Sequence, residues 1–285
     1  MTGALYGVMV LLQGPITAAQ ADSSTFVLRD VRFASGESLP ELRLFYITIG
    51  RPQRDATGTV RNAVLILHGT GGRGVQFFGP SFTELFGPGA PLDTAKLFLI
   101  FPDNVGHGRS SKPSDGLRGA FPHYAYQDMV ALQYRLVTER LHVNHLRLVM
   151  GTSMGCMHSW LWAERYPDFM DGVVALACAP TQIAGRNRMF RKMIIDDIRD
   201  DPAWQGGNYT AQPPGLRAAL QILFMMGSSP WQLQRSAPTR DSARTGRTDP
   251  SSRRENADAA CHARAAVAGE SAPHRSRSSS EGVLR

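Results

Sequence analysis

Continuous apolar runs bounded by turn residues recur through the first two thirds of the chain and predict buried parallel strands. Two of them are separated by a segment, 124–141, whose apolar residues follow helical spacing. Strands that alternate with helices predict an α/β fold, a parallel sheet with helices on both faces. The four strand-like runs are 62–67, 96–101, 146–150 and 173–179.

The segments before and after these runs differ from them. Short apolar stretches at 26–28 and 42–47, with turn residues between them, predict a β-hairpin. Residues 181–235 hold two helical patterns, 189–198 and 216–226, around a turn-rich stretch. A helical insertion after a sheet strand predicts a cap over the active-site end of the sheet.

The last fifty residues have a different composition. Residues 236–285 contain no Phe, Trp, Tyr, Met or Ile, and they are rich in Arg, Ser and Ala. Such a segment cannot bury enough apolar surface to offset its ordering entropy, so we expect it to be disordered. It carries nine Arg against six acidic residues and so supplies +3 of the net charge of +7. The basic residues outside this segment are spread out and form no stripe interleaved with aromatic residues, so no nucleic-acid site is expected.

The first 21 residues have the pattern of an export signal. An apolar stretch at 4–12 precedes Ala19-Gln20-Ala21, a cleavage site of small residues, although no Lys or Arg occurs before Arg29. The stretch is too short to span a membrane, so no stable membrane anchor is expected. The missing basic residue has two explanations, a true start further upstream or an apolar N-terminal strand or tail in place of a signal. The expected location is the periplasm or outside the cell, and the alternative is the cytoplasm. The expected organisation is a signal peptide at 1–21, a core at 22–180, a helical cap at 181–235 and a tail at 236–285.

The strand at 146–150 runs directly into Gly151-Thr152-Ser153-Met154-Gly155, and a helical segment follows. The pattern G-x-S-x-G between a strand and a helix is typical of a nucleophile elbow. Glycine lets the chain turn sharply and lets the strand and helix approach closely. Ser153 is therefore the candidate nucleophile, and the alternative is a glycine-rich turn with an idle serine.

Acyl transfer at a serine also needs donors for the oxyanion. The backbone N–H of Met154 follows the nucleophile, and His68-Gly69-Thr70 follows the first core strand, so the N–H groups of Met154 and Thr70 are the candidate donors. His68 and His107 are expected to support their loops. No cofactor is expected, and no His/Cys cluster predicts a metal.

A general base and its acid are harder to find. In the architecture of this elbow the order is Ser, then Asp or Glu, then His. His158 lies on the elbow helix and is poorly placed. His262 and His274, with Asp249 or Asp258, satisfy the order, but no apolar strand precedes them to hold them in place. The acid and base are therefore predicted to be absent.

The three cysteines form no spaced framework. Cys156 and Cys178 are expected to pack as small buried hydrophobic side chains.

Several motifs resemble the homoserine O-acetyltransferase-like branch of the α/β-hydrolases. The resemblance covers about 25–240 and rests on seven stretches of sequence. It implies acyl transfer through an acyl-serine at Ser153, with Thr70 and Met154 as oxyanion donors. The stretches are 41–44, 84–92, 106–116, Gly151-Thr152-Ser153-Met154-Gly155, Arg165-Tyr166-Pro167-Asp168, 185–187 and 201–209, with Met157 and Trp162 in the helix after the elbow.

Two features depart from that family. The N-terminus looks exported, whereas the biosynthetic acetyltransferases are cytoplasmic. Family members also continue with two further core strands that carry the catalytic Asp and His, where this chain has its Arg/Ser/Ala-rich tail. A frameshift near 240–245, or truncation, would explain the tail.

The expected function is serine-dependent acyl transfer, as an ester hydrolase or O-acyltransferase on a small-molecule ester or acyl-thioester, impaired by the missing acid and base. A non-catalytic binding protein with the same cleft and an unstable fragment are the alternatives. The sequence does not indicate the acyl acceptor or the oligomeric state.

Overall fold

The computed structural model describes residues 21–236 of the chain. All but the last residue of the predicted signal peptide, and all but the first residue of the predicted tail, lie outside the described residues. Cys261, His262, His274, Asp249 and Asp258 belong to that outer part.

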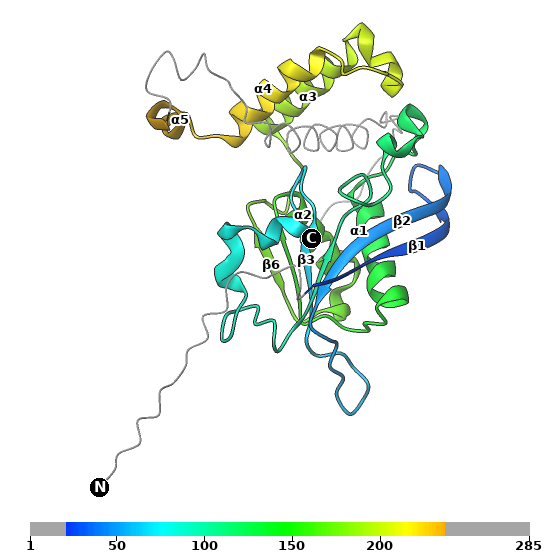
Figure 1. Cartoon of the computed structure of the whole chain (residues 1–285), viewed down its shortest axis with the longest axis vertical. Coiled ribbons are helices and arrows are strands. Elements are labelled where there is room, and N and C mark those ends of the chain that lie inside the picture. Colours follow the sequence, from blue (N-terminus) through cyan, green and yellow to red (C-terminus); the bar gives the residue numbers. More distant parts are fainter. Residues whose placement is uncertain (1–20, 237–285) are drawn as a thin grey trace, which may run out of the picture. The chain divides into compact units, whose positions relative to one another are not determined.

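Six strands form one sheet in the order β1-β2-β4-β3-β5-β6 (Figure 1). β2 runs antiparallel to β4, whereas β4, β3, β5 and β6 are mutually parallel. The predicted α/β fold with a mostly parallel sheet is therefore confirmed. The strands are β1 (Asp22–Arg32), β2 (Ser38–Ile49), β3 (Ala63–Leu67), β4 (Phe98–Pro102), β5 (Leu148–Thr152) and β6 (Val173–Leu176).

The predicted helices are present, with a local difference in the first of them, and the structure adds α5, which was not predicted. The predicted helix at 124–141 is an α-helix only as far as Arg135, and it ends in a π-helical turn, η6 (Leu136–Arg140). The α-helices are α1 (Tyr126–Arg135), α2 (Met154–Arg165), α3 (Gly185–Arg199), α4 (Gly215–Gly227) and α5 (Pro230–Ser236). The 3₁₀ segments are η2 (Gly74–Phe78), η3 (Pro80–Leu85), η4 (Pro113–Asp115), η5 (Arg118–Ala120), η7 (Pro167–Phe169) and η8 (Pro202–Gly207).

The described residues group into two compact units. The first, which we call the sheet unit, contains 21–28, 42–111 and 129–180. The second contains 29–41, 112–128 and 181–236, and its small core joins α3 to α4 through Ile194, Ile198, Leu216, Ala219 and Ile222. The role of 181–235 as a cap stays a prediction.

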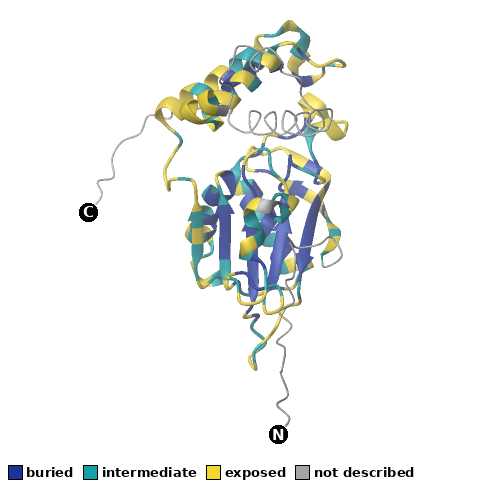
Figure 2. Cartoon of the chain, turned by 60° about the vertical axis from the view of Figure 1, so that its left-hand side comes forward, coloured by how far each residue is buried: buried dark blue, intermediate teal, exposed yellow. Residues whose placement is uncertain are grey.

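The central strands of the sheet unit are buried on both faces, and they are coloured accordingly in Figure 2. Successive side chains of a strand point to opposite faces. In β3, Leu65 and Leu67 pack on one face with Val130 of α1 and Trp162 of α2. Ile66 packs on the other face, with aromatic residues of η2 and of the segment after it. The continuous apolar runs in the sequence thus reflect a layer covered on both sides, by helices on one face and by 3₁₀ turns on the other.

β6 is shorter than its apolar run predicted, because the chain leaves the strand after Leu176. Ala177 has a φ of 61°, in the left-handed region, and cannot continue an extended strand. Among the described strands, β6 lies at the edge of the sheet, and Val174 and Leu176 are partly exposed there (38% and 40%).

The start of α2 lies against the end of β3, and glycine makes this approach possible. A Cβ atom on Gly155 would lie 2.1 Å from the carbonyl oxygen of Leu67 and 2.8 Å from that of His68. A Cβ atom on Gly151 would lie 2.2 Å from the carbonyl oxygen of Gly155. Both obstacles are backbone atoms, which cannot rotate away as a flexible side chain could. Glycine at 151 and 155 is therefore a packing requirement.

No helix between residues 21 and 236 combines the length and apolarity that crossing a membrane requires.

We expect Gly155→Ala to lower the free energy of unfolding by about 2–4 kcal/mol, because the new methyl group must push α2 away from β3. Urea unfolding followed by circular dichroism measures this change. Gly87→Ala is the matched control, since a Cβ atom on Gly87 meets nothing within 4 Å. Equal stability of the two variants would show that α2 does not depend on this approach.

Candidate active site

Ser153 lies at the turn between β5 and α2, where the sequence predicted a nucleophile. Its backbone has φ 51° and ψ −111°, a conformation that non-glycine residues rarely adopt. Its N–H donates to the carbonyl of Leu176 at the end of β6 (2.9 Å), and its own carbonyl accepts from Met157 N–H in α2 (3.1 Å). These bonds hold the strained turn in place. The side chain of Ser153 is exposed, as a nucleophile requires.

The loop after β3 passes directly beside Ser153. A Cβ atom on Gly69 would lie 3.5 Å from the Cβ atom of Ser153 and 3.4 Å from the carbonyl oxygen of Thr152. Thr70 follows Gly69 and is exposed. The structure therefore brings the loop that carries Thr70 against the elbow that carries Ser153, although 83 positions separate the two residues in the sequence.

Met154 is the first residue of α2, and its side chain is almost fully buried (2% exposed). The first N–H groups of a helix have no carbonyl partner within the helix, so the N–H of Met154 is available to an acceptor outside it. The same helix end favours negative charge. A serine oxygen or an oxyanion at this position would gain from both effects.

The rim of the site also carries a polar contact from η2. The side-chain amide of Gln76 donates to Oγ1 of Thr152 (3.2 Å), and both side chains are partly buried. Because Thr152 precedes Ser153, this bond ties η2 to the end of β5 beside the elbow.

Three histidines of the sheet unit, His68, His107 and His158, are fully buried. His68 contacts Gly69 and Asn104, and Nδ1 of His107 lies 3.1 Å from the carbonyl oxygen of Val105. His158 lies on the inner side of α2, where its Nδ1 is 3.2 Å from the side-chain amide of Gln133. Within residues 21–236, the hydroxyl of Ser153 forms no side-chain hydrogen bond with a histidine. The structure thus brings the loop of Thr70 to the turn that holds Ser153 and Met154, and the absence of a general base stays a prediction.

His158 is neutral at physiological pH. Burial, assisted by the nearby His68, lowers the pKa of His158 from 6.5 to about 3. An imidazole that cannot take up a proton at neutral pH is unsuited to act as a general base. Its neutral ring is instead a hydrogen-bond acceptor for Gln133.

Asp103, which follows β4, also has a structural role. Asp103 is buried, and its two oxygens accept the backbone N–H groups of Gly74 (2.7 Å) and Arg109 (2.8 Å). Asp103 thereby fixes the loop that holds His107. Across the described part of the chain, no group of three or more His, Cys, Asp or Glu residues is arranged to hold a metal ion.

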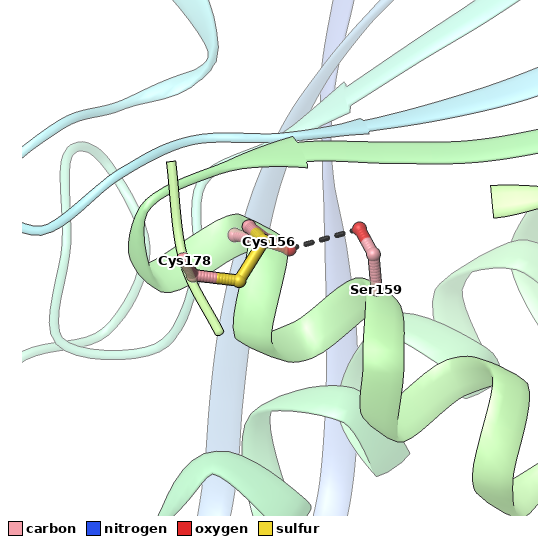
Figure 3. The surroundings of a disulfide bond; sticks show 4 residues. Cys156, Ser159 and Cys178 are labelled. Carbon is pink, nitrogen blue, oxygen red and sulfur yellow. Dashed lines mark hydrogen bonds between the residues drawn. A yellow bond between two sulfur atoms is a disulfide. The ribbon is translucent and has the colours of Figure 1, made fainter. Parts of the chain in front are cut away.

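Cys156 and Cys178 form a disulfide bond beside the elbow (Figure 3). Their expected role as two packed thiols was therefore wrong, although Cys156 is fully buried. The two Cα atoms lie 6.0 Å apart, because α2 starts beside the end of β6. A separation of 22 positions gave no sign of this in the sequence. The neighbouring Ser159 donates its hydroxyl to the carbonyl of Gly155 (2.9 Å), which further ties the first turns of α2 together (Figure 3).

Sequence reasoning also missed a set of buried polar residues beneath the site. Asn104 and Gln133 are 2% exposed, and they link the loop after β3 to α1 and α2. Gln133, a polar residue between Leu132 and Tyr134, is the signal that the sequence carried, whereas Asn104 follows Asp103 in a polar loop and gave none.

Comparisons with known proteins agree with this geometry. Residues 62–245 match the family described as alpha/beta hydrolase fold. The chain is similar to a homoserine O-acetyltransferase of Solidesulfovibrio magneticus (34% identity over 209 residues, 68% of this chain and 50% of the relative). It is also similar to an ethyl acetate hydrolase of Pseudomonas veronii (34% over 151 residues, 50% and 43%).

A solved structure, that of the acetyl esterase MekB, shares the fold with a TM-score of 0.68 at 24% identity, over 87% of this chain and 72% of that one. The chain spans about half the length of the curated relatives it matches. The resemblance to the homoserine O-acetyltransferase-like branch is confirmed by these similarities. The family match covers well over half of the chain, and the protein therefore belongs to the α/β-hydrolase fold family.

Proposed function

We propose that this protein transfers an acyl group through an acyl-serine at Ser153, as an ester hydrolase or an O-acyltransferase. The observation that carries the proposal is the exposed, strained Ser153 at the start of α2, with the loop of Thr70 beside it. The matched relatives include an acyltransferase and an ester hydrolase, and their names point to small-molecule acyl or ester substrates.

In the first step, Oγ of Ser153 attacks the carbonyl carbon of an ester or thioester. A C–O bond forms, the carbonyl oxygen becomes an oxyanion, and the N–H groups of Thr70 and Met154 donate to it. The oxyanion collapses, the bond to the leaving group breaks, and the serine proton leaves with that group. Water or an alcohol then attacks the acyl-serine, takes the acyl group and returns a proton to Ser153.

We infer that turnover is weak in this chain. His68, His107 and His158 are buried and hydrogen bonded to groups other than Ser153, which supports the expectation that a base is missing. A site that keeps its oxyanion donors but lacks the rest of a triad retains a residual acceleration on the order of 10³–10⁴ over water. Acylation by an activated ester is therefore the step that we expect to be measurable.

We also propose that the protein works in an oxidising compartment. Disulfides persist in exported proteins and are rare in the cytosol. The bond between Cys156 and Cys178 supports export, to the periplasm or outside the cell.

We expect p-nitrophenyl acetate to acetylate wild-type protein on Ser153, as measured by intact and peptide mass spectrometry after acid quenching. Ser153→Ala removes the nucleophile and should abolish this label. Ser81→Ala, which changes an exposed serine on η3, should leave it unchanged. If the protein folds cooperatively but is not acetylated on Ser153, it is a binding protein and not an enzyme.

Counting free thiols tests whether the protein works in an oxidising compartment. The chain has three cysteines, so protein from its native cells should show one free thiol before reduction and three after. Reduction should lower the free energy of unfolding by about 3 kcal/mol, because it opens a loop closed by the disulfide. Three free thiols in native protein would contradict export to an oxidising compartment.

A further inference from the structure

Four buried side chains form a continuous hydrogen-bonded chain from α2 to the loop after β3. Trp162 of α2 contacts Gln133 of α1, Gln133 contacts Asn104 after β4, and Asn104 contacts His68. Each of the four is at most 2% exposed. We call these four residues the relay.

The hydrogen bonds of the relay all run from donor to acceptor in the same direction, and Trp162 determines that direction. An indole nitrogen can only donate, and Nε1 of Trp162 donates to Oε1 of Gln133 (2.7 Å). The amide nitrogen of Gln133 must then face the other way, and its two hydrogens serve Oδ1 of Asn104 (2.5 Å) and Nδ1 of the neutral His158 (3.2 Å). The orientation of the Gln133 amide is therefore determined by its partners.

The same donor-to-acceptor direction makes His68 the next acceptor. Because Oδ1 of Asn104 accepts from Gln133, the amide nitrogen of Asn104 faces His68, 3.1 Å from Nε2. The backbone N–H of Asn104 donates to the same Nε2 (3.1 Å). Nε2 is thus an acceptor, which assigns the proton of the neutral ring to Nδ1. Nδ1 donates that proton to the carbonyl oxygen of Gly69 (2.9 Å).

The carbonyl of Gly69 shares one peptide group with the N–H of Thr70. In a trans peptide these two groups point in opposite directions, and the described chain has no cis peptides. The Gly69 oxygen also accepts from Gly72 N–H (3.0 Å), so two donors hold it. Fixing this oxygen toward His68 directs the N–H of Thr70 away from the interior.

We propose that the relay of Trp162, Gln133, Asn104 and His68 positions the Thr70 N–H as an oxyanion donor. The inference rests on the proposed function at Ser153. All four are positioning residues, since each acts through the Gly69–Thr70 peptide and none reaches the acyl group. A donor aligned in advance needs no reorganisation when the oxyanion forms.

The test compares two tryptophans on the same helix. Trp162→Phe removes the donor that sets the direction of the relay but keeps an aromatic ring in the core. Trp160→Phe makes the same change two residues away, at a side chain that is 41% exposed. Acetylation of Ser153 by p-nitrophenyl acetate should slow about tenfold in Trp162→Phe, and it should be unchanged in Trp160→Phe.

A thionoester substrate distinguishes a misplaced oxyanion donor from general distortion of the protein core. Replacing the carbonyl oxygen of p-nitrophenyl acetate by sulfur weakens hydrogen bonding to the N–H donors. Acylation by the thionoester should therefore change little in Trp162→Phe, and the ratio of oxygen-ester to thionoester rates should fall about tenfold. Equal slowing of both substrates would overturn the proposal, because a distorted core affects both alike.

A second readout does not depend on acylation. The Thr70 amide signal in a ¹H–¹⁵N NMR spectrum should shift in Trp162→Phe but not in Trp160→Phe. Gln133→Met, which breaks the relay with an unbranched side chain of similar length, should give the same shift if Trp162→Phe does not fold. An unchanged Thr70 signal in a folded relay variant would refute the relay. Absence of acetylation in the wild type would refute only the proposed function.

Discussion

The approach of α2 to the end of β3 is the constraint on which the site depends. At Gly155 the backbone of the helix lies so close to the carbonyls of Leu67 and His68 that no side chain fits between them. This contact brings the first N–H groups of α2, Ser153 and the loop after β3 into one place. The buried faces of the sheet supply the stability that holds a strained residue such as Ser153.

The far side of the elbow is held by β6. The N–H of Ser153 donates to the end of this strand, the chain then turns at Ala177, and Cys178 is bonded to Cys156 in α2. Among the described strands β6 lies at the edge, where hydrogen bonds from only one neighbour hold it. The disulfide therefore reinforces the site at the position where the sheet alone restrains it least.

Much of the fold was predictable because burial on both faces leaves a simple pattern. β3 and β4 are apolar at nearly every position, and the G-x-S-x-G motif stands between a strand and a helix, which located Ser153. Thr70 and Met154 followed from their places after a strand and after the nucleophile. The end of β6 was not predictable, because Ala177 adopts its left-handed φ through tertiary contacts and not through an intrinsic preference.

The sequence by itself determined which segments are buried, where the chain turns at Ser153, and which backbone groups follow the strands. These are local properties, set by apolar periodicity and by the conformational freedom of glycine. Only the tertiary structure decided that Cys156 meets Cys178, that His68, His107 and His158 are buried and hydrogen bonded to other groups, and that Trp162 is linked to His68. Each of these depends on contacts between residues far apart in the chain, and no local pattern records such a pairing.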